Sequence, residues 1–488
     1  MNKFNMMFGV SFKIQEIYNS LSVAKKLVLW YTIATIIQKG ILFLVTPLYT
    51  RLLTDLEYGV FSVYQSWQML VSIITVLALD RCITVGFMKF ANDRRVFLSA
   101  VQSLMTITVV LFALPVVIFA SFFERLMGLS IHIIAVMFIV ALMNNTFANW
   151  MWLQRYRYNY KKLAAVTILS TVIIQLISVY SVIYFPAANK GEILILSSAL
   201  GGVLLYGILY VSVFVEGKEF YNSKYWTFAL RYSVAVIPHA LAQIILNSSD
   251  RIMIDKLCGR ADAAYYSITY TAAMVINLVV LSLCLASQPW FFEKIKGHDF
   301  NSIKKKTNFI LLFTASLVVL ASLVAPEVLS ILAPASYNAA LQIFPSIATS
   351  VLFYSMYISF ANFESYYEKP FYFSIATTIV AIVNIILNYI FIPMFGFVAA
   401  GYTTLLCYIL FAVMHYMFMR KVCQEKLENI KVFDEKFIVG LSIITILLSF
   451  VITVTYQFQL IRYALILFVS IIVMTKRKVI VQQMKNLL

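Results

Sequence analysis

A single lysine stands near the middle of the first long apolar stretch of the chain. Lys39 lies within residues 27–49, which are otherwise apolar enough to cross a bilayer apart from the neighbouring Gln38. About 20 helical residues rise roughly 30 Å, so Lys39 falls near the membrane midplane, where a charge costs at least about 2.5 kcal/mol. Two interpretations stay open: Lys39 snorkels or pairs with a carboxylate, or it lines a wet cavity and attracts an anion. No Asp or Glu lies deep inside any apolar stretch, which favours the second.

A second group of candidates follows a proline inside a later apolar stretch. His239 comes directly after Pro238 and is either a packed, hydrogen-bonded histidine or a second, proton-responsive cavity group. Asp250 and Arg251 end this stretch, either as an interfacial ion pair or as an outer gate or coupling-ion site. We group Arg51, at the outer end of the first stretch, with this gate.

Basic residues alternate with tyrosines after the fourth apolar stretch. The motif RYRYNYKK covers residues 155–162, and Asp80–Arg81 holds a similar place after the second stretch. Such clusters are mostly a topology signal, but they also suit a phosphorylated lipid headgroup. We therefore expect a cytoplasmic rim formed by Arg81, Arg155, Arg157 and Lys161.

Residue types for other chemistry are scattered. The five cysteines form no CxxC pair, the four histidines are dispersed, and no HExxH motif or paired carboxylates occur. We expect no metal site, no cofactor and no enzymatic activity. Amides such as Asn384 and Asn388 lie within apolar stretches, where hydrogen bonding between helices accounts for most of them.

The elements that must position these residues are membrane-spanning helices. The chain of 488 residues is 62% hydrophobic and only 12% charged, which predicts an all-α polytopic membrane protein and disfavours a β-barrel. Fourteen apolar stretches are long enough to span a bilayer, the last being the shortest. They are 27–49, 58–79, 97–120, 131–152, 163–185, 193–215, 229–249, 264–287, 308–333, 339–360, 371–392, 397–419, 437–456 and 460–475.

The basic residues indicate the orientation. With the N-terminus inside, the inner segments hold 30 of the 38 Lys and Arg residues, the outer segments hold seven, and Lys39 is the remaining one. This bias follows the positive-inside rule and places both termini in the cytoplasm. The formal charge of +17 is thus a property of the inner face and no sign of nucleic-acid binding. The longest outer connection, around 250–263, is short, which disfavours a large outer domain.

A weak internal repeat suggests two lobes. LTDLEYGVFSVY at 53–64 and CGRADAAYYSITY at 258–270 both place a small polar turn before an aromatic re-entry, and an even number of helices separates them. Parallel repeats of this kind occur in transporters whose substrate lies between two lobes. We predict the following segments: a cytoplasmic lead-in 1–26, an N-lobe 27–215, a linker 216–228, a C-lobe 229–419, a cytoplasmic loop 420–436, and two last helices with a basic tail 437–488.

Several motifs together resemble a known family of membrane proteins. They are PLYTRLLTDLEYGVFSVYQSW (47–67), LALDRCI (77–83), ILNSSDRIMIDKLCG (245–259), AAYYSITY (263–270), SQPWFF (287–292) and NIILNYIFIPMFGFVAAGYTT (384–404). The set resembles bacterial polysaccharide-biosynthesis membrane proteins, the Wzx-type flippases of O-antigen and capsule repeat units in the MATE-like MOP superfamily. The resemblance covers nearly the whole chain.

The resemblance implies fourteen helices, two MATE-like six-helix lobes plus two C-terminal helices, a cationic cavity and alternating access. The cargo would be an undecaprenyl-pyrophosphate-linked oligosaccharide, moved to the periplasmic leaflet of the bacterial inner membrane, with a glycan polymerase and a chain-length regulator as partners. Lys39 matches the cationic lumen, but few other cations lie deep in the first lobe. The alternatives are a cation-coupled multidrug exporter, a peptidoglycan-precursor flippase and a membrane glycan polymerase, the last disfavoured by the short outer loops.

Overall fold

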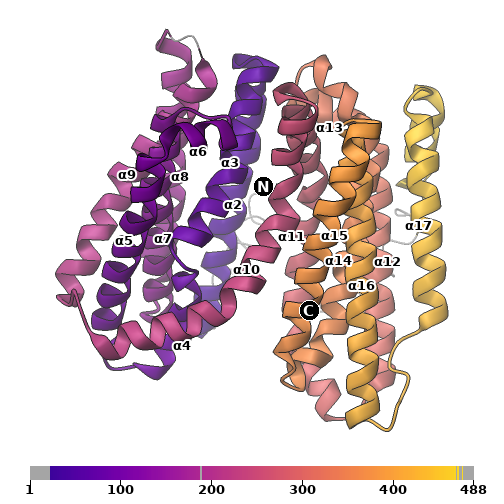
Figure 1. Cartoon of the computed structure of the whole chain (residues 1–488). Helices are drawn as coiled ribbons and strands as arrows, with labels where there is room; N and C mark the ends of the chain where they lie inside the picture. Colours follow the sequence, from indigo (N-terminus) through magenta and orange to yellow (C-terminus); the bar gives the residue numbers. More distant parts are fainter. Residues whose placement is uncertain (1–21, 187–188, 469, 472–474, 476–488) are drawn as a thin grey trace, which may run out of the picture. The chain divides into compact units, whose positions relative to one another are not determined.

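The computed structural model describes residues 22–186, 189–468, 470–471 and 475, and this part of the chain is helical throughout (Figure 1). The predicted all-helical membrane fold is confirmed. The predicted lead-in, apart from residues 22–26, and the basic tail from 476 lie outside the described residues. The elements are α2 (Val23–Leu52), α3 (Asp55–Thr75), η1 (Leu79–Arg81), α4 (Cys82–Lys89), α5 (Arg94–Ile118), α6 (Ala120–Met127), α7 (Ile131–Tyr156), α8 (Tyr160–Tyr184), α9 (Lys190–Gly217), α10 (Ser223–Leu257), α11 (Arg260–Lys296), α12 (Phe300–Leu323), α13 (Ala325–Leu332), η2 (Ala335–Ile343), α14 (Phe344–Tyr366), α15 (Pro370–Phe395), α16 (Val398–Lys426) and α17 (Glu435–Thr455).

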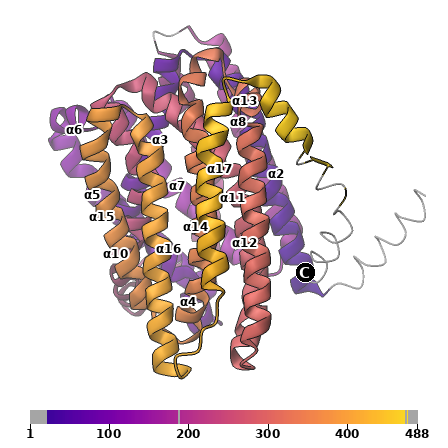
Figure 2. The same ribbon diagram turned by 90° about the vertical axis from the view of Figure 1, so that its right-hand side faces the viewer.

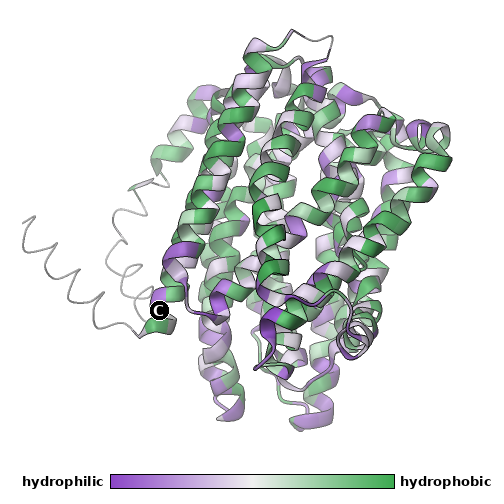
Figure 3. Ribbon diagram, turned by 90° about the vertical axis from the view of Figure 1, so that its left-hand side faces the viewer, coloured by the Kyte–Doolittle hydropathy of each residue, from purple (hydrophilic) through white to green (hydrophobic). Residues whose placement is uncertain are grey.

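Twelve helices of the described residues are long and apolar enough to cross a membrane. A thirteenth span is present if α3 and the η1–α4 segment, which bend by 69° at their junction, are taken as one. The predicted fourteenth span, 460–475, overlaps the shorter apolar helix Gln459–Phe468 and in part lies outside the described residues. Hydrophobic residues occupy the middle of the helices and hydrophilic residues gather near their ends, as a membrane-spanning protein requires (Figure 3).

Two compact units divide the described chain. The N-terminal unit contains the residues up to Leu52 and Leu70–Ile237, and the C-terminal unit contains Leu53–Met69 and the residues from Pro238 onward. In the N-terminal unit α8 packs against α2 and α9, and α7 packs against α5 and α9. The lobe boundaries predicted from the sequence stay a prediction.

Helix α14 is the centre of the C-terminal unit. It packs against α11, α12, α16 and α17, several of which Figure 2 shows side by side. Of the most apolar 18 residues of the η2–α14 span, 83% are buried, compared with 6% for α2. This burial explains why α14 tolerates polar side chains that find partners inside the unit.

One predicted connection differs from the structure. We expected an outer loop around 250–263, but α10 continues to Leu257 and α11 begins at Arg260, so only Cys258 and Gly259 connect them. Gly259 has φ +130°, a backbone conformation that residues with a Cβ rarely adopt, and this sharp turn replaces the loop. The sequence pattern missed it because the polar residues of 250–263 find partners along the helices themselves.

The first half of α3 belongs to the C-terminal unit through close contacts. A Cβ on Gly59 would lie 2.1 Å from the carbonyl oxygen of Arg260, so the two backbones touch. Tyr265 donates a hydrogen bond of 2.7 Å to Asp55, and Ser336 donates another of 3.2 Å. These contacts explain why residues early in the chain group with the C-terminal unit.

Candidate functional site

Lys39 lies near the middle of α2, in the N-terminal unit. Its side chain is exposed and forms no hydrogen bond or ion pair with the described residues. Helix α2 packs against α8, where Tyr49 donates a hydrogen bond of 2.8 Å to Gln175. The Lys39 ammonium is therefore left without a protein counter-charge in the described part of the chain.

The predicted rim residues differ in how far their charges are already bound. Arg155 stacks on two rings. Its Cζ atom lies 3.8 Å from the ring centroid of Tyr31 of α2 and 4.1 Å from that of Trp152 of its own helix. Tyr31 precedes Lys39 by about two helical turns, roughly 12 Å along the axis. Helix α2 therefore contains Lys39 and also the ring on which Arg155 stacks. No carboxylate of the described residues pairs with Arg155, and its Nε atom is buried without a hydrogen-bond partner among them.

The other rim residues are engaged or exposed. Arg157 forms an ion pair with Glu216 at the end of α9, and Arg81 pairs with the adjacent Asp80 at 3.2 Å. Lys161 is exposed at the start of α8. The structure thus brings Arg157 to a carboxylate, which leaves Arg155 and Lys161 as the more available cations of this rim.

The predicted gate residues lie on two helices, Arg51 in α2 and Asp250 and Arg251 in α10, and α10 also holds the predicted cavity residue His239. Arg51, in the last turn of α2, is exposed and donates a hydrogen bond of 3.0 Å to the carbonyl oxygen of Pro47. His239 is half-buried in α10, directly after Pro238. Arg51, His239 and Lys39 therefore remain candidate residues whose roles are predictions.

Asp250 is the most fully hydrogen-bonded of the predicted site residues. It lies in α10, within the C-terminal unit, and is only 1% exposed. Tyr266 of α11 donates to Oδ2 at 2.6 Å, Thr404 of α16 donates to Oδ2 at 3.0 Å, and Asn388 of α15 donates to Oδ1 at 2.6 Å. Four helices thus converge on a single carboxylate.

A second layer of polar groups surrounds this carboxylate. Asn384, one turn before Asn388, accepts hydrogen bonds from Ser249 at 3.0 Å and from Asn388 at 3.3 Å. Thr403 donates to the Asn388 side-chain oxygen. Hydroxyl, amide and carboxylate oxygens gathered in this way are the ligands that small hard cations bind, and a proton is an equal candidate.

Arg251 does not pair with Asp250 in the described structure. Its guanidinium donates to Ser267 at 2.9 Å and to the backbone oxygen of Asn247 at 2.9 Å, and it stacks over Tyr270 at 4.5 Å. The two neighbouring residues therefore have different partners and do not form the predicted ion pair with each other.

One buried pair was missed by the sequence analysis. Glu364 of α14 and His415 of α16 are both fully buried, and the His415 ring nitrogen Nδ1 lies 2.8 Å from the Glu364 carboxylate. Glu364 falls just beyond the predicted span 339–360, so it was counted as a loop residue. Among the described residues, no three His, Cys, Asp or Glu side chains are grouped to hold a metal ion.

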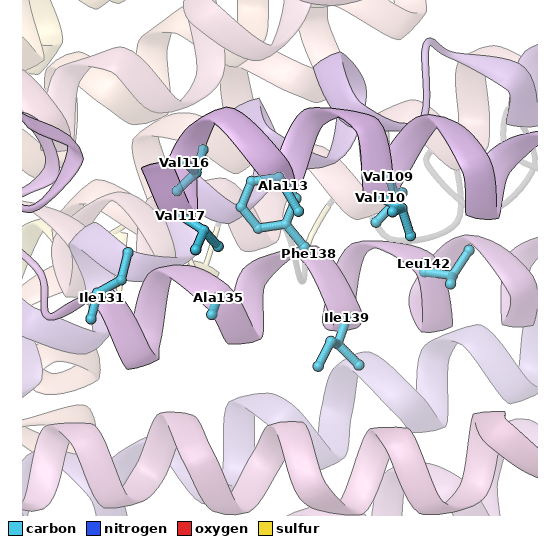
Figure 4. Close-up of a pocket in the computed structure, with 10 residues that line it drawn as sticks. All are labelled: Val109, Val110, Ala113, Val116, Val117, Ile131, Ala135, Phe138, Ile139 and Leu142. Atoms are coloured by element: carbon cyan, nitrogen blue, oxygen red, sulfur yellow. The ribbon is translucent and has the colours of Figure 1, made fainter. Parts of the chain in front are cut away.

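A cavity of about 230 Å³ lies between α5 and α7 (Figure 4). All ten lining side chains are hydrocarbon, and Val110, Val117 and Ile139 are about half exposed or more. A cavity of this composition offers no partner for a phosphate or a sugar hydroxyl. We therefore place no polar-ligand site there.

The sequence model described as "Polysaccharide biosynthesis protein" matches residues 24–295, more than half of the chain. The chain belongs to this family. The resemblance drawn from the motifs is thereby confirmed.

Relatives of this polysaccharide biosynthesis protein are distant in sequence. An uncharacterised membrane protein of Methanocaldococcus jannaschii is 22% identical over 450 residues, covering 84% of this chain and 86% of that protein. Among solved structures, the lipid II flippase MurJ in an inward closed conformation is 16% identical, with a TM-score of 0.62, covering 93% of this chain and 100% of that chain. An inward-facing multidrug resistance MATE transporter is 14% identical, with a TM-score of 0.54 over 81% of this chain and 95% of that chain. These similarities establish a fold shared with MOP-superfamily transporters.

Proposed function

We propose that this protein flips an undecaprenyl-pyrophosphate-linked oligosaccharide across the bacterial inner membrane by alternating access. The repeat unit would move from the cytoplasmic to the periplasmic leaflet, and both termini of the chain would lie in the cytoplasm. A glycan polymerase and a chain-length regulator would act on the delivered units. Membership of the polysaccharide biosynthesis family and the fold shared with transporters support this class of activity.

The observation that carries the proposal is the exposed Lys39 ammonium in the middle of α2. A charge held at this depth without a counter-charge from the described residues is available to an anionic ligand. The pyrophosphate would pair with Lys39, and Arg155 and Lys161 would attract it at the rim. The sugars would bind polar groups while the prenyl tail stays in lipid.

Asp250 is our candidate for coupling transport to an ion. A buried carboxylate within a spanning helix is costly and marks proton or cation pathways in transporters. Its three hydrogen-bond donors come from α11, α15 and α16, so occupancy by a proton or a cation would change how four helices pack. Arg51 and Arg251 would contribute to gating, and His239 would be a second cavity group that binds the pyrophosphate.

A cation-coupled multidrug exporter is the second candidate, because the fold is shared with a MATE transporter. Drug exporters of cationic compounds need an accessible carboxylate. The carboxylate of Asp250 is buried, and the exposed mid-helix charge is a lysine. This arrangement favours an anionic cargo.

Complementation tests the proposal. A strain lacking its surface-glycan flippase should regain surface glycan with the wild-type protein and with Lys39→Arg, but not with Lys39→Ala, provided that all three insert equally. Equal activity of Lys39→Ala would remove Lys39 from the substrate site. Drug efflux without glycan restoration by the wild type would replace the flippase by the exporter.

A further inference from the structure

The C-terminal unit holds a second buried acidic group besides Asp250. Glu364 lies near the end of α14 and faces His415 on α16, with both residues 0% exposed. The Nδ1 atom of His415 lies 2.8 and 3.0 Å from the two carboxylate oxygens. No other side chain of the described residues donates to this carboxylate, so the imidazole is its one polar side-chain partner.

Aromatic rings enclose the imidazole on its remaining sides. The ring centroids of Tyr357, Phe411, Phe373 and Phe418 lie 4.6, 4.7, 5.4 and 6.2 Å from that of His415. The second ring nitrogen, Nε2, is buried and has no hydrogen-bond partner among the described residues. The faces of such rings attract a cation, and a cation would also stabilise the desolvated carboxylate.

Few titratable groups of the described residues face the pair. From α14 the titratable groups that face His415 are Glu364 and the Tyr357 phenol, while α15 and α16 present phenylalanines. Several charged side chains of the surrounding elements pair with one another: Lys294 with Asp299, Lys304 with Asp434, Lys431 with Glu435, and Lys369 with Glu425. None of these eight side chains forms a hydrogen bond or ion pair with the side chain of Glu364 or His415.

Counting protons shows which net charge the site favours. With neutral imidazole and ionised carboxylate the pair has a net charge of −1, which is costly in an apolar enclosure. One further proton makes the pair neutral overall. On Nε2, it yields an imidazolium held between the carboxylate and the rings.

We propose that Glu364 and His415 form a proton-binding site, distinct from Asp250, that holds an imidazolium–carboxylate pair and releases its proton during the transport cycle. Release requires water to reach the pair, and hence a separation of α14 from α16 at this level. In the closed pair the proton is retained, whereas separation exposes both groups and lets the proton leave to water. The site thereby links a proton to the packing of the central helix of this unit.

The two ionisable sites lie on one face of α16. Thr404, Tyr408, Phe411 and His415 follow a spacing of three to four residues, which places them along a single stripe of the helix. Thr404 contacts Asp250, and Tyr408 donates a hydrogen bond of 3.3 Å to Asn247 of α10. A movement of α16 would therefore alter both sites, although no hydrogen-bonded chain between them is required.

Nuclear magnetic resonance of ¹⁵N-labelled histidine tests the site directly. The chain contains only four histidines, and His415→Asn identifies the signal of His415 by its loss. We expect an imidazolium signal in the wild type at neutral pH and a neutral imidazole in Glu364→Gln, which keeps a hydrogen-bond acceptor but removes the counter-charge. A neutral imidazole in the wild type at neutral pH would overturn the proposal. The wild-type spectrum is decisive even if Glu364→Gln does not fold.

Transport measured against pH supplies the second readout and rests on the proposed function. Glu364→Gln should move the pH of half-maximal transport by at least about one unit, the shift expected from losing one strong charge partner. Glu425→Gln removes the carboxylate of an exposed ion pair in the same unit and should keep the wild-type profile. An unchanged profile in Glu364→Gln would overturn the role in transport. If the wild type moves no glycan, the proposed function fails, while the spectrum still decides whether the proton site exists.

Discussion

Lys39 and Asp250 are opposite solutions to holding a charge inside a membrane protein. The ammonium of Lys39 is exposed on a helix of which little is buried, and the described residues give it no counter-charge. The carboxylate of Asp250 is buried and accepts three hydrogen bonds from three other helices. An exposed, unsatisfied charge can bind a large ligand, whereas an enclosed one is accessible only to a proton or a small cation. This difference supports our proposal that Lys39 binds the substrate and that Asp250 couples transport to an ion.

Replacing Asp250 should have the largest effect. Asp250→Asn keeps an oxygen acceptor but removes the charge, so we expect an inserted protein whose transport falls by about 100-fold, the upper range for coupling between two sites. Asp250→Ala should also unfold more readily, since it leaves three buried donors without an acceptor. Surface glycan and thermal unfolding in detergent measure the two effects.

A charge-swapped control sharpens this prediction. Asn388 contacts Asp250 at 2.6 Å, so the double variant Asp250→Asn with Asn388→Asp returns one carboxylate to the same network. Partial recovery of transport would indicate that the network needs a carboxylate, whichever helix carries it. Full activity in Asp250→Asn alone would reduce Asp250 to a packing role and end the contrast with Lys39.

Replacing Lys39 should have the second largest effect. We expect Lys39→Ala to lower transport by roughly 30-fold, because losing one partner of a partly desolvated charge pair costs about 2 kcal/mol. Its thermal unfolding should not change, since the described residues form no bond to this ammonium. Glycan flux and unfolding temperature, each compared with the values for Lys39→Arg, separate a role in substrate binding from a role in stability. A lower unfolding temperature would place Lys39 with the structural charges.

Much of the fold follows from sequence because apolar length is a local property. The stretch containing Lys39 could be recognised in this way, and the lysine stands out within it. The partners of Asp250 could not, because Asn388 and Thr404 are 138 and 154 residues away and only folding brings them together. Asn384 and Asn388, one helical turn apart in an apolar stretch, were the one signal, and they were attributed to hydrogen bonding between helices.

Charged residues at the ends of helices were harder to assign. Glu364 looked like a residue of a connecting loop, because hydropathy windows end where polar residues begin. The structure extends α14 past it to Tyr366 and buries it. His415 was passed over because nothing near it in sequence is acidic, and its partner lies 51 residues earlier.

At the rim, Arg155 should matter several-fold more than Arg157. Arg155 is half-buried and stacked on Tyr31 and Trp152, and no carboxylate of the described residues pairs with it. We expect Arg155→Ala to reduce transport about fivefold, since a basic residue near a membrane surface contributes about 1 kcal/mol to binding an anionic headgroup. Arg155→Lys keeps the charge without the planar stack, so its transport rate should lie between those of the wild type and Arg155→Ala. Initial rates at low substrate concentration measure this effect, which would disappear at saturation.

The smallest effect should come from Arg157, although it lies two residues from Arg155. Its guanidinium already pairs with Glu216, so its removal takes little from an incoming phosphate. We expect Arg157→Ala to retain transport within about twofold, as for other solvent-accessible ion pairs. Glu216→Ala then becomes informative, because it frees Arg157 and should strengthen headgroup capture at low salt. If Arg157→Ala is as harmful as Arg155→Ala, the rim attracts the substrate through its total charge. Whether a charge already has a partner, which is also the difference between Lys39 and Asp250, would then not decide which residues bind the substrate.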